Sequence, residues 1–216
     1  IEQTVSRFLA NVFTYRALRG LGLRNPTWET RLPQQVATGL QRIYSLQNLD
    51  GGWGWWTWEQ SSPMLTAYVL LGLLEAKRAD FLVHQPVMDS AVGYLQQWLD
   101  QEPQPTRRAR DERAFVLYVL AEAGQGDLGR AVLLYDQRAE MSLYAKAYLA
   151  MTLALLDPTE ASRLTTLTNE LVNAALLSAT GAHWEESVKD KWAMNTDTRS
   201  TAIILRALVA VSPQNP

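Results

Sequence analysis

Two residue types with versatile chemistry are scarce in this 216-residue sequence, which has no cysteine and only two histidines, His84 and His183. The absence of cysteine excludes disulfide bonds, thiolate metal ligands and a cysteine nucleophile within this chain. The two histidines lie far apart in the sequence, and neither has a second histidine at ligand spacing. We therefore predict no metal site, and nothing in the sequence indicates a cofactor.

Long apolar runs and long runs of one charge are lacking as well. The longest apolar stretches, such as AYVLLGLL at 67–74, are too short to span a bilayer. The chain has 20 Lys and Arg against 22 Asp and Glu, a net charge of −2, and segments such as RRARDERA at 107–114 mix both signs. We expect no membrane insertion by this domain, because its apolar runs are too short. We also expect no nucleic-acid partner, because the sequence has no basic patch or stripe.

What the sequence does contain is apolar residues at helical spacing along most of its length, with no convincing strand alternation. Short connections between helices make neighbours antiparallel, so the spacing predicts an all-α fold of helical hairpins. The predicted helices cover 2–20, from after Pro33 to 46, 63–79, 86–100, 110–123, 127–137, 141–156, 159–177 and 198–211.

Four of these helices resemble one another, because each mixes small and large apolar residues in a way that suits close packing. They contain TAYVLLGLLEA (66–76), RAFVLYVLAEAG (113–124), KAYLAMTLALL (146–156) and STAIILRALVAV (200–211). We interpret them as copies of one element on the inner wall of a ring of hairpins. Two turns also look related, since SLQNLDGGWGWW and LLSATGAHWEES both place Gly and Trp just past a predicted helix.

The first of these turns carries a motif. Residues 47–54, QNLDGGWG, resemble the Gln-x-x-Asp-Gly-Gly repeat of the terpenoid cyclase and protein prenyltransferase superfamily, whose members form an alpha/alpha toroid. The glycines permit a tight turn, and Trp53 is expected to pack between neighbouring hairpins. The chain has no Asp-x-Asp acid motif and no cysteine for a prenyltransferase zinc site. A cyclase-like or prenyltransferase-like enzyme domain therefore remains only an alternative.

The opening residues point to a second resemblance within the same fold. IEQTVSRFLANVFTYRAL, residues 1–18, is similar to the segment that follows the thioester cysteine in bacterial alpha-2-macroglobulins, where the motif is Cys-x-Glu-Gln. A cysteine just before Ile1 would complete that motif with Glu2 and Gln3. The resemblance implies that residues 1–216 are a fragment of a single thioester-type toroid domain, starting just after this cysteine and lacking the last helices.

The resemblance also implies a function, a covalent protease trap in the intact parent protein. Gln3 would be the acyl donor of the thioester and Glu2 would support it, while Trp55, Trp56 and Trp58 would cover the thioester or dock on a neighbouring domain. The implied partners are proteases and the other domains of the parent chain, and the implied location is the periplasm or cell envelope. Acyl transfer occurs once, so the domain would be an endopeptidase inhibitor and not an enzyme. A scaffold of the same fold without the thioester is the remaining alternative.

Overall fold

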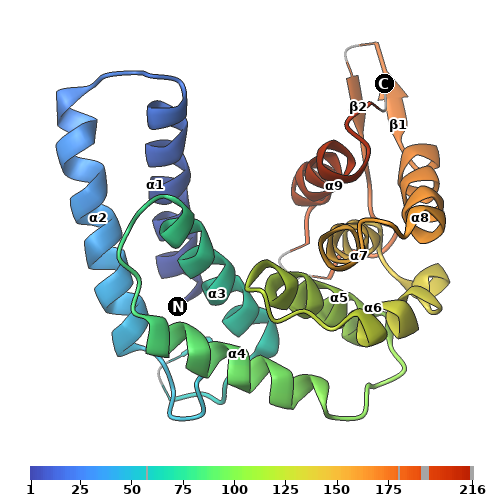
Figure 1. The fold of residues 1–216 in the computed structure, drawn as a ribbon, viewed down its shortest axis with the longest axis horizontal. Helices are drawn as coiled ribbons and strands as arrows, with labels where there is room; N and C mark the ends of the chain where they lie inside the picture. The colour runs from blue at the N-terminus through green and yellow to red at the C-terminus, as the bar shows by residue number, and fades with distance from the viewer. Residues whose placement is uncertain (57, 180, 191–194, 215–216) are drawn as a thin grey trace. The chain divides into compact units, whose positions relative to one another are not determined.

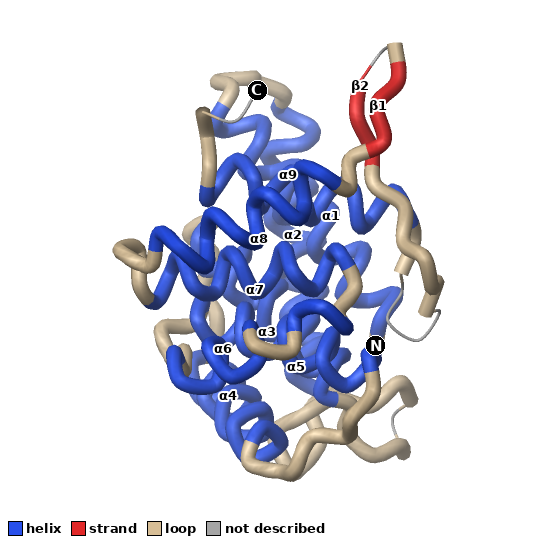
Figure 2. Tube along the Cα trace, turned by 90° about the vertical axis from the view of Figure 1, so that its right-hand side faces the viewer, coloured by secondary structure: helices blue, strands red, loops and turns tan. Residues whose placement is uncertain are grey.

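The computed structural model describes residues 1–56, 58–179, 181–190 and 195–214 (Figure 1), and it confirms the all-α class. Helices dominate these ranges, with one short β-hairpin visible in Figure 2. Contacts divide the chain into two compact units, Ile1–Gln101 and Glu102–Pro216. None of the described helices is both long and apolar enough to cross a membrane.

The first unit contains four helices, α1 (Glu2–Gly20), α2 (Pro26–Ser45), α3 (Pro63–Arg78) and α4 (Gln85–Leu99). Helix α3 packs against α1 and α4, and α1 packs against α2. The apolar positions of α3 are buried on nearly all sides, as expected for a helix without a polar face. Helix α2 approaches α1 closely at Gly39, where an added Cβ atom would lie only 2.8 Å from the Phe8 ring.

The second unit contains α5 (Arg107–Glu122), α6 (Leu128–Tyr135), a 3₁₀ turn (Arg138–Glu140), α7 (Leu143–Leu156), α8 (Ala161–Asn173), β1 (Leu176–Ser178), β2 (Gly181–His183) and α9 (Asp197–Val211). Helix α7 packs against α5, α6, α8 and α9. Phe115 and Tyr118 of α5 contact Tyr148 of α7, with ring centroids 4.9 and 5.1 Å apart. All three rings belong to the buried core of the unit.

Helix α9 is less buried than the sequence predicts for a helix on an inner wall. Among its described side chains only Ser200, Ile204 and Ala207 are buried, while Leu205 and Val209 are 45 % and 70 % exposed. The physical reason is that α9 contacts α7, α8 and β2 through one face. Its remaining apolar residues therefore face away from the core of this unit.

The predicted start of the second helix is wrong. Helix α2 begins at Pro26, and Pro33 lies inside it. The Asn25 side chain accepts a hydrogen bond from the Trp28 amide at 3.2 Å, and a proline suits the first helical position because its missing N–H is not needed there. Burial of Leu32 beside Pro33 helps to offset the hydrogen bond that this proline removes.

The predicted extent of the eighth helix is also too long. Helix α8 ends at Asn173, and the chain then forms the β1–β2 hairpin, in which Leu176 pairs with His183 and Ser178 with Gly181. Each strand has three residues and all six are exposed, so no buried face imposes an alternating pattern on the sequence.

Candidate functional site

The Asp-Gly-Gly turn at residues 50–52 is held by local hydrogen bonds. The Asp50 carboxylate accepts bonds from the Gly52 amide at 2.9 Å and from the Ser61 hydroxyl at 2.7 Å. Gly51 has φ of 88°, and a Cβ atom there would lie 2.4 Å from the Ser90 carbonyl oxygen. Glycine is therefore required at this position both by backbone conformation and by the close approach of α4.

Trp53 follows this turn and joins two helices. Its side chain is fully buried, and its indole N–H donates to the Ile43 carbonyl of α2 at 2.9 Å. Its backbone N–H donates to the Thr66 hydroxyl of α3 at 3.0 Å. We call this pair of hydrogen bonds the tryptophan latch.

The same latch occurs in the second unit. The Trp184 indole donates to the Leu171 carbonyl of α8 at 2.7 Å, and its backbone N–H donates to the Thr201 hydroxyl of α9 at 3.0 Å. The two turns that look related in sequence thus make equivalent bonds. A structural role accounts for both of these tryptophans.

The remaining tryptophans of the first turn are placed differently. Trp56 and Trp58 are 64 % and 82 % exposed, and their rings stack with centroids 6.0 Å apart. Trp55 is half-buried, and its carbonyl oxygen lies 3.5 Å from the backbone nitrogen of Ile1. The structure therefore brings the tryptophan-rich turn against the residue that precedes Glu2 and Gln3.

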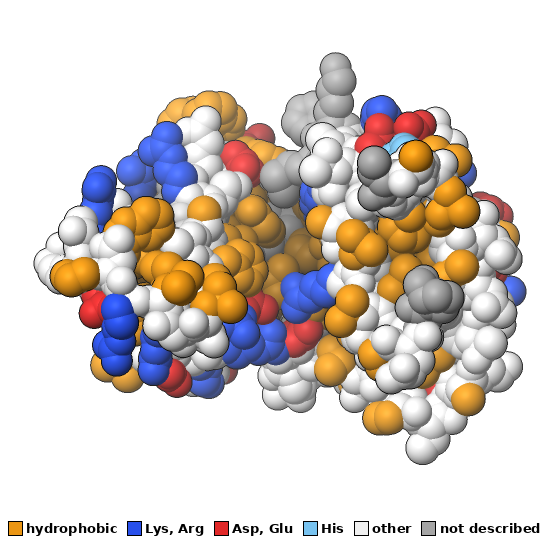
Figure 3. All heavy atoms as spheres, turned by 90° about the horizontal axis from the view of Figure 1, so that it is seen from above, with side chains coloured by type: hydrophobic (Ala, Val, Ile, Leu, Met, Phe, Trp, Pro, Cys, Tyr) orange, Lys and Arg blue, Asp and Glu red, His pale blue; other side chains and the backbone are white. Residues whose placement is uncertain are grey.

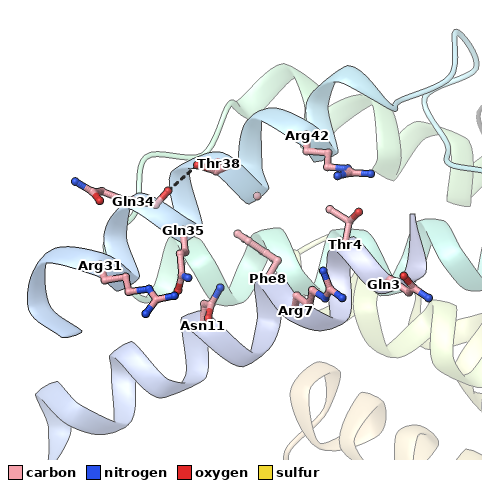
Figure 4. Close-up of a pocket in the computed structure, with 11 residues that line it drawn as sticks. Gln3, Thr4, Arg7, Phe8, Asn11, Arg31, Gln34, Gln35, Thr38 and Arg42 are labelled. Carbon is pink, nitrogen blue, oxygen red and sulfur yellow. Dashed lines mark hydrogen bonds between the residues drawn. The ribbon is translucent and has the colours of Figure 1, made fainter. Parts of the chain in front are cut away.

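Glu2 and Gln3 point to different surroundings. The Ser6 hydroxyl donates to the Glu2 carboxylate at 2.7 Å and also lies 3.2 Å from the Tyr68 hydroxyl of α3. Glu2 is thereby tied, through Ser6, to the helix beneath it. Gln3 is exposed and lines a groove between α1 and α2 (Figure 4).

This groove, of about 610 Å³, was not predicted from the sequence. Its charged lining residues are Arg7 of α1 and Arg31 and Arg42 of α2, and no carboxylate is found among the described residues that line it. In Figure 3, blue side chains are prominent over the α1–α2 part of the surface. We call this feature the arginine groove. The positions 31, 34, 35, 38 and 42 fall at helical spacing, and this spacing is the signal that could have identified one wall of it.

Two buried carboxylates in the second unit are the clearest candidates for acid chemistry. Asp111 accepts bonds from the Ser142 amide at 2.9 Å and the Ser142 hydroxyl at 2.5 Å, and burial raises its pKa to about 6. Glu186 accepts bonds from the Leu143 and Tyr144 amides at 3.1 and 2.9 Å. Both carboxylates therefore cap the N-terminus of α7, where the free amides and the helix dipole favour negative charge.

This capping gives both carboxylates a structural role at the start of α7. Neither Asp111 nor Glu186 lines the arginine groove or a second, smaller pocket of about 420 Å³ between α1 and α2 around Trp28. Over the described ranges, no three His, Asp or Glu side chains are grouped in a way that could hold a metal ion.

Comparison with known proteins agrees with the resemblance inferred from residues 1–18. The family model of the A-macroglobulin TED domain matches residues 1–111. Alpha-2-macroglobulin of Thermotoga maritima is 35 % identical over 95 residues, which are 44 % of this chain and 6 % of that protein. Alpha-2-macroglobulin of Xylella fastidiosa is 31 % identical over 144 residues, which are 62 % of this chain and 9 % of that protein. The chain therefore spans less than a tenth of either relative.

Solved structures show the same fold. Salmonella alpha-2-macroglobulin reacted with methylamine matches all of this chain and 14 % of its own, with a TM-score of 0.76 and 20 % identity. Escherichia coli alpha-2-macroglobulin activated by porcine elastase matches 96 % of this chain and 18 % of its own, with a TM-score of 0.74 and 20 % identity. Because the family match covers more than half of its length and the fold agrees, the chain belongs to the A-macroglobulin TED domain family.

Proposed function

We propose that this chain is a thioester domain of a bacterial alpha-2-macroglobulin-like protease inhibitor, and that residues 1–216 belong to one such domain. In the intact protein, Gln3 supplies the acyl group of a thioester with a cysteine immediately before Ile1. The observation that carries the proposal is the position of Gln3, which is exposed on the first turn of α1. Two residues before it, the backbone nitrogen of Ile1 lies 3.5 Å from the Trp55 carbonyl oxygen. Membership of the A-macroglobulin TED domain family supports it.

The chemistry follows from the spacing of the two side chains. The cysteine would directly precede Ile1, the N-cap of α1, and would stand three positions before Gln3 on the first turn. We propose that its thiol reaches the side-chain carbonyl carbon of Gln3 from there. Its thiol attacks that carbon, the C–S bond forms, and the amide nitrogen leaves as ammonia. A lysine amine of a protease then attacks the same carbon, and an amide bond replaces the C–S bond. The thiolate leaves and takes up the proton released by the amine, so the transfer happens once per molecule.

Such a thioester must be kept from water until it is used. We propose that Trp55, Trp56 and Trp58 provide this protection, either directly or by docking a neighbouring domain of the parent chain. The exposed Trp56–Trp58 stack supports this role, because two open indole rings at one point form an apolar patch suited to a protein partner. Glu2, fixed by Ser6, supports the start of α1 beneath the thioester.

The partners and location of the parent protein are part of the proposal. Solved relatives include the Escherichia coli protein activated by porcine elastase and the Salmonella protein reacted with methylamine. By analogy with them, we propose that proteases are the covalent targets and that amines attack the thioester directly. A periplasmic or cell-envelope location is proposed from the bacterial relatives.

The test is a mass measurement on a protein in which cysteine immediately precedes Ile1. Treatment with methylamine should add the mass of one methylamine to residue 3 and release one free thiol. Gln3→Ala should abolish the gain, whereas Gln34→Ala, which changes the same groove on α2, should leave it intact. A thiol that is already free and no mass gain would reject the thioester and leave a scaffold of this fold.

A second measurement tests the tryptophan cover. In the same protein, Trp56→Ser combined with Trp58→Ser should speed the spontaneous hydrolysis of the thioester, because water would reach it more easily. Trp28→Ser is the matched control, because it removes an exposed tryptophan from the first turn of α2, at the opposite end of this helix from the tryptophan-rich turn. Equal hydrolysis rates in both variants would contradict the covering role.

A further inference from the structure

The arginine groove runs between the exposed faces of α1 and α2. Figure 4 shows Asn11 of α1 across from Arg31 and Gln35 of α2, and Arg7 further along α1 toward the Gln3 end, with Phe8 between the two helices. Beneath these polar side chains, Phe8 of α1 packs against Gly39 of α2, where an added Cβ atom would lie 2.8 Å from the Phe8 ring. The two polar walls therefore stand apart above an apolar floor.

The charge of this groove is uncompensated. Arg7, Arg31 and Arg42 all line it, and within the described ranges none of the three forms an ion pair. Other arginines of the same unit do, since Arg16 pairs with Glu75 and Arg19 with Asp80. Three guanidinium groups spread along the lining of one groove attract negative charge, although the chain as a whole carries a net charge of −2.

The other lining groups suit a peptide. Side-chain amides of Gln3, Asn11, Gln34 and Gln35 line the walls, and each can both donate to and accept from a peptide backbone. Guanidinium groups bind carboxylates through two parallel hydrogen bonds. The stretch of α1 from residue 3 to residue 11 is about 12 Å long at 1.5 Å per residue. An extended segment rises about 3.3 Å per residue, so roughly four residues would fit along it.

We propose that the arginine groove binds an extended acidic segment of a partner protein. A nucleic acid fits less well, because single strands are held largely by stacking on open aromatic rings. Among the described lining residues, the aromatic ring is that of Phe8, which is only 1 % exposed. Carboxylate side chains on an extended backbone match both the guanidinium groups and the amides.

The position of Gln3 gives this binding a consequence that rests on the proposed function. Gln3 lines one end of the groove, so a bound segment would lie beside the proposed acyl donor. Acidic segments of a protease would then bring neighbouring lysines toward the thioester. The binding itself needs no cysteine, so it is tested on the 216-residue chain independently of the methylamine experiment.

The test is fluorescence anisotropy of a fluorescein-labelled hexapeptide of alternating Glu and Asp, titrated with the 216-residue chain at low salt. A peptide with Gln and Asn in place of these residues is the ligand control. Arg31→Gln combined with Arg42→Gln should weaken binding of the acidic peptide by about tenfold or more, because two charge-assisted contacts are lost.

The matched protein control is Arg24→Gln combined with Arg108→Gln, which removes the same charge outside the groove. This pair should change the affinity by less than about twofold, and circular dichroism should show both double variants folded. An equal loss in both variants would refute the groove as the site, as would no binding of the acidic peptide. Tighter binding of inorganic phosphate or of a single-stranded oligonucleotide to the same arginines would refute the proposed ligand class.

Discussion

Replacement of Thr66 by valine isolates one bond of the tryptophan latch. The two side chains have nearly the same shape, so the substitution removes the hydroxyl that accepts the Trp53 backbone N–H at 3.0 Å without leaving a cavity. Both residues are fully buried, so water cannot replace the lost acceptor. An unsatisfied buried N–H costs about 1–3 kcal/mol, and we expect the free energy of unfolding to fall by about 2 kcal/mol.

Equilibrium urea unfolding, followed by circular dichroism and tryptophan fluorescence, measures this change. Thr38→Val is the control, because Thr38 is exposed and its hydroxyl donates to the Gln34 carbonyl of its own helix. We expect the control to shift the free energy of unfolding by less than about 0.5 kcal/mol. A Thr66→Val variant as stable as the control would refute the argument that the latch bond stabilises this unit. Thr201→Val tests the equivalent bond of Trp184.

Two further predictions concern a turn glycine and a buried acid. Gly51→Ala should destabilise the chain by about 2–4 kcal/mol in urea unfolding, from its φ of 88° and a clash with the Ser90 carbonyl. Gly93→Ala, in open space on α4, should be neutral or stabilising by up to about 1 kcal/mol, and the reverse ranking would contradict this geometry. Burial raises the pKa of Asp111 from 3.8 to about 6, so the folded state holds a proton that the unfolded chain loses between those values. The stabilisation from this proton is full below about pH 4 and is lost as the pH rises through about 6. The unfolding free energy of the unmodified chain minus that of Asp111→Asn should therefore fall across this window, and a flat or rising difference would show that the pKa is not raised.

Much of the fold follows from local patterns in the sequence. Helices α3, α5 and α7 are predicted within a few residues because their apolar positions repeat at helical spacing and burial imposes that pattern. The start of α2 is missed because a proline usually marks the start of a helix, so Pro33 predicts a later start than the Asn25 cap gives. The β1–β2 hairpin is missed because its exposed strands carry no periodicity.

The features of the candidate site also fall into those that the sequence predicts and those that depend on helix packing. Motifs in the sequence predict Gln3 and the tryptophan-rich turn as parts of a site, and the structure adds the contact between the Trp55 carbonyl and the backbone nitrogen of Ile1. The arginine groove has a readable wall on α2, where Arg31 and Arg42 lie eleven positions apart on one helical face. Its opposite wall depends on how α1 packs against α2, and a pattern within one helix does not encode that pairing.

The tryptophan latch has a consequence for where this domain can accept new sequence. Trp53 and its threonine partner are 13 positions apart, whereas Trp184 and its partner are 17 apart, yet the hydrogen bonds are equivalent. When both ends of a loop are anchored, a change in its length alters the free energy of folding only slightly, because the entropic cost of loop closure grows slowly with length. The interval between indole and threonine can therefore differ in length from one copy of the turn to the other while both latch bonds are kept. What the turn carries, such as the Trp56–Trp58 stack in the first copy, is thereby separate from what joins the helices.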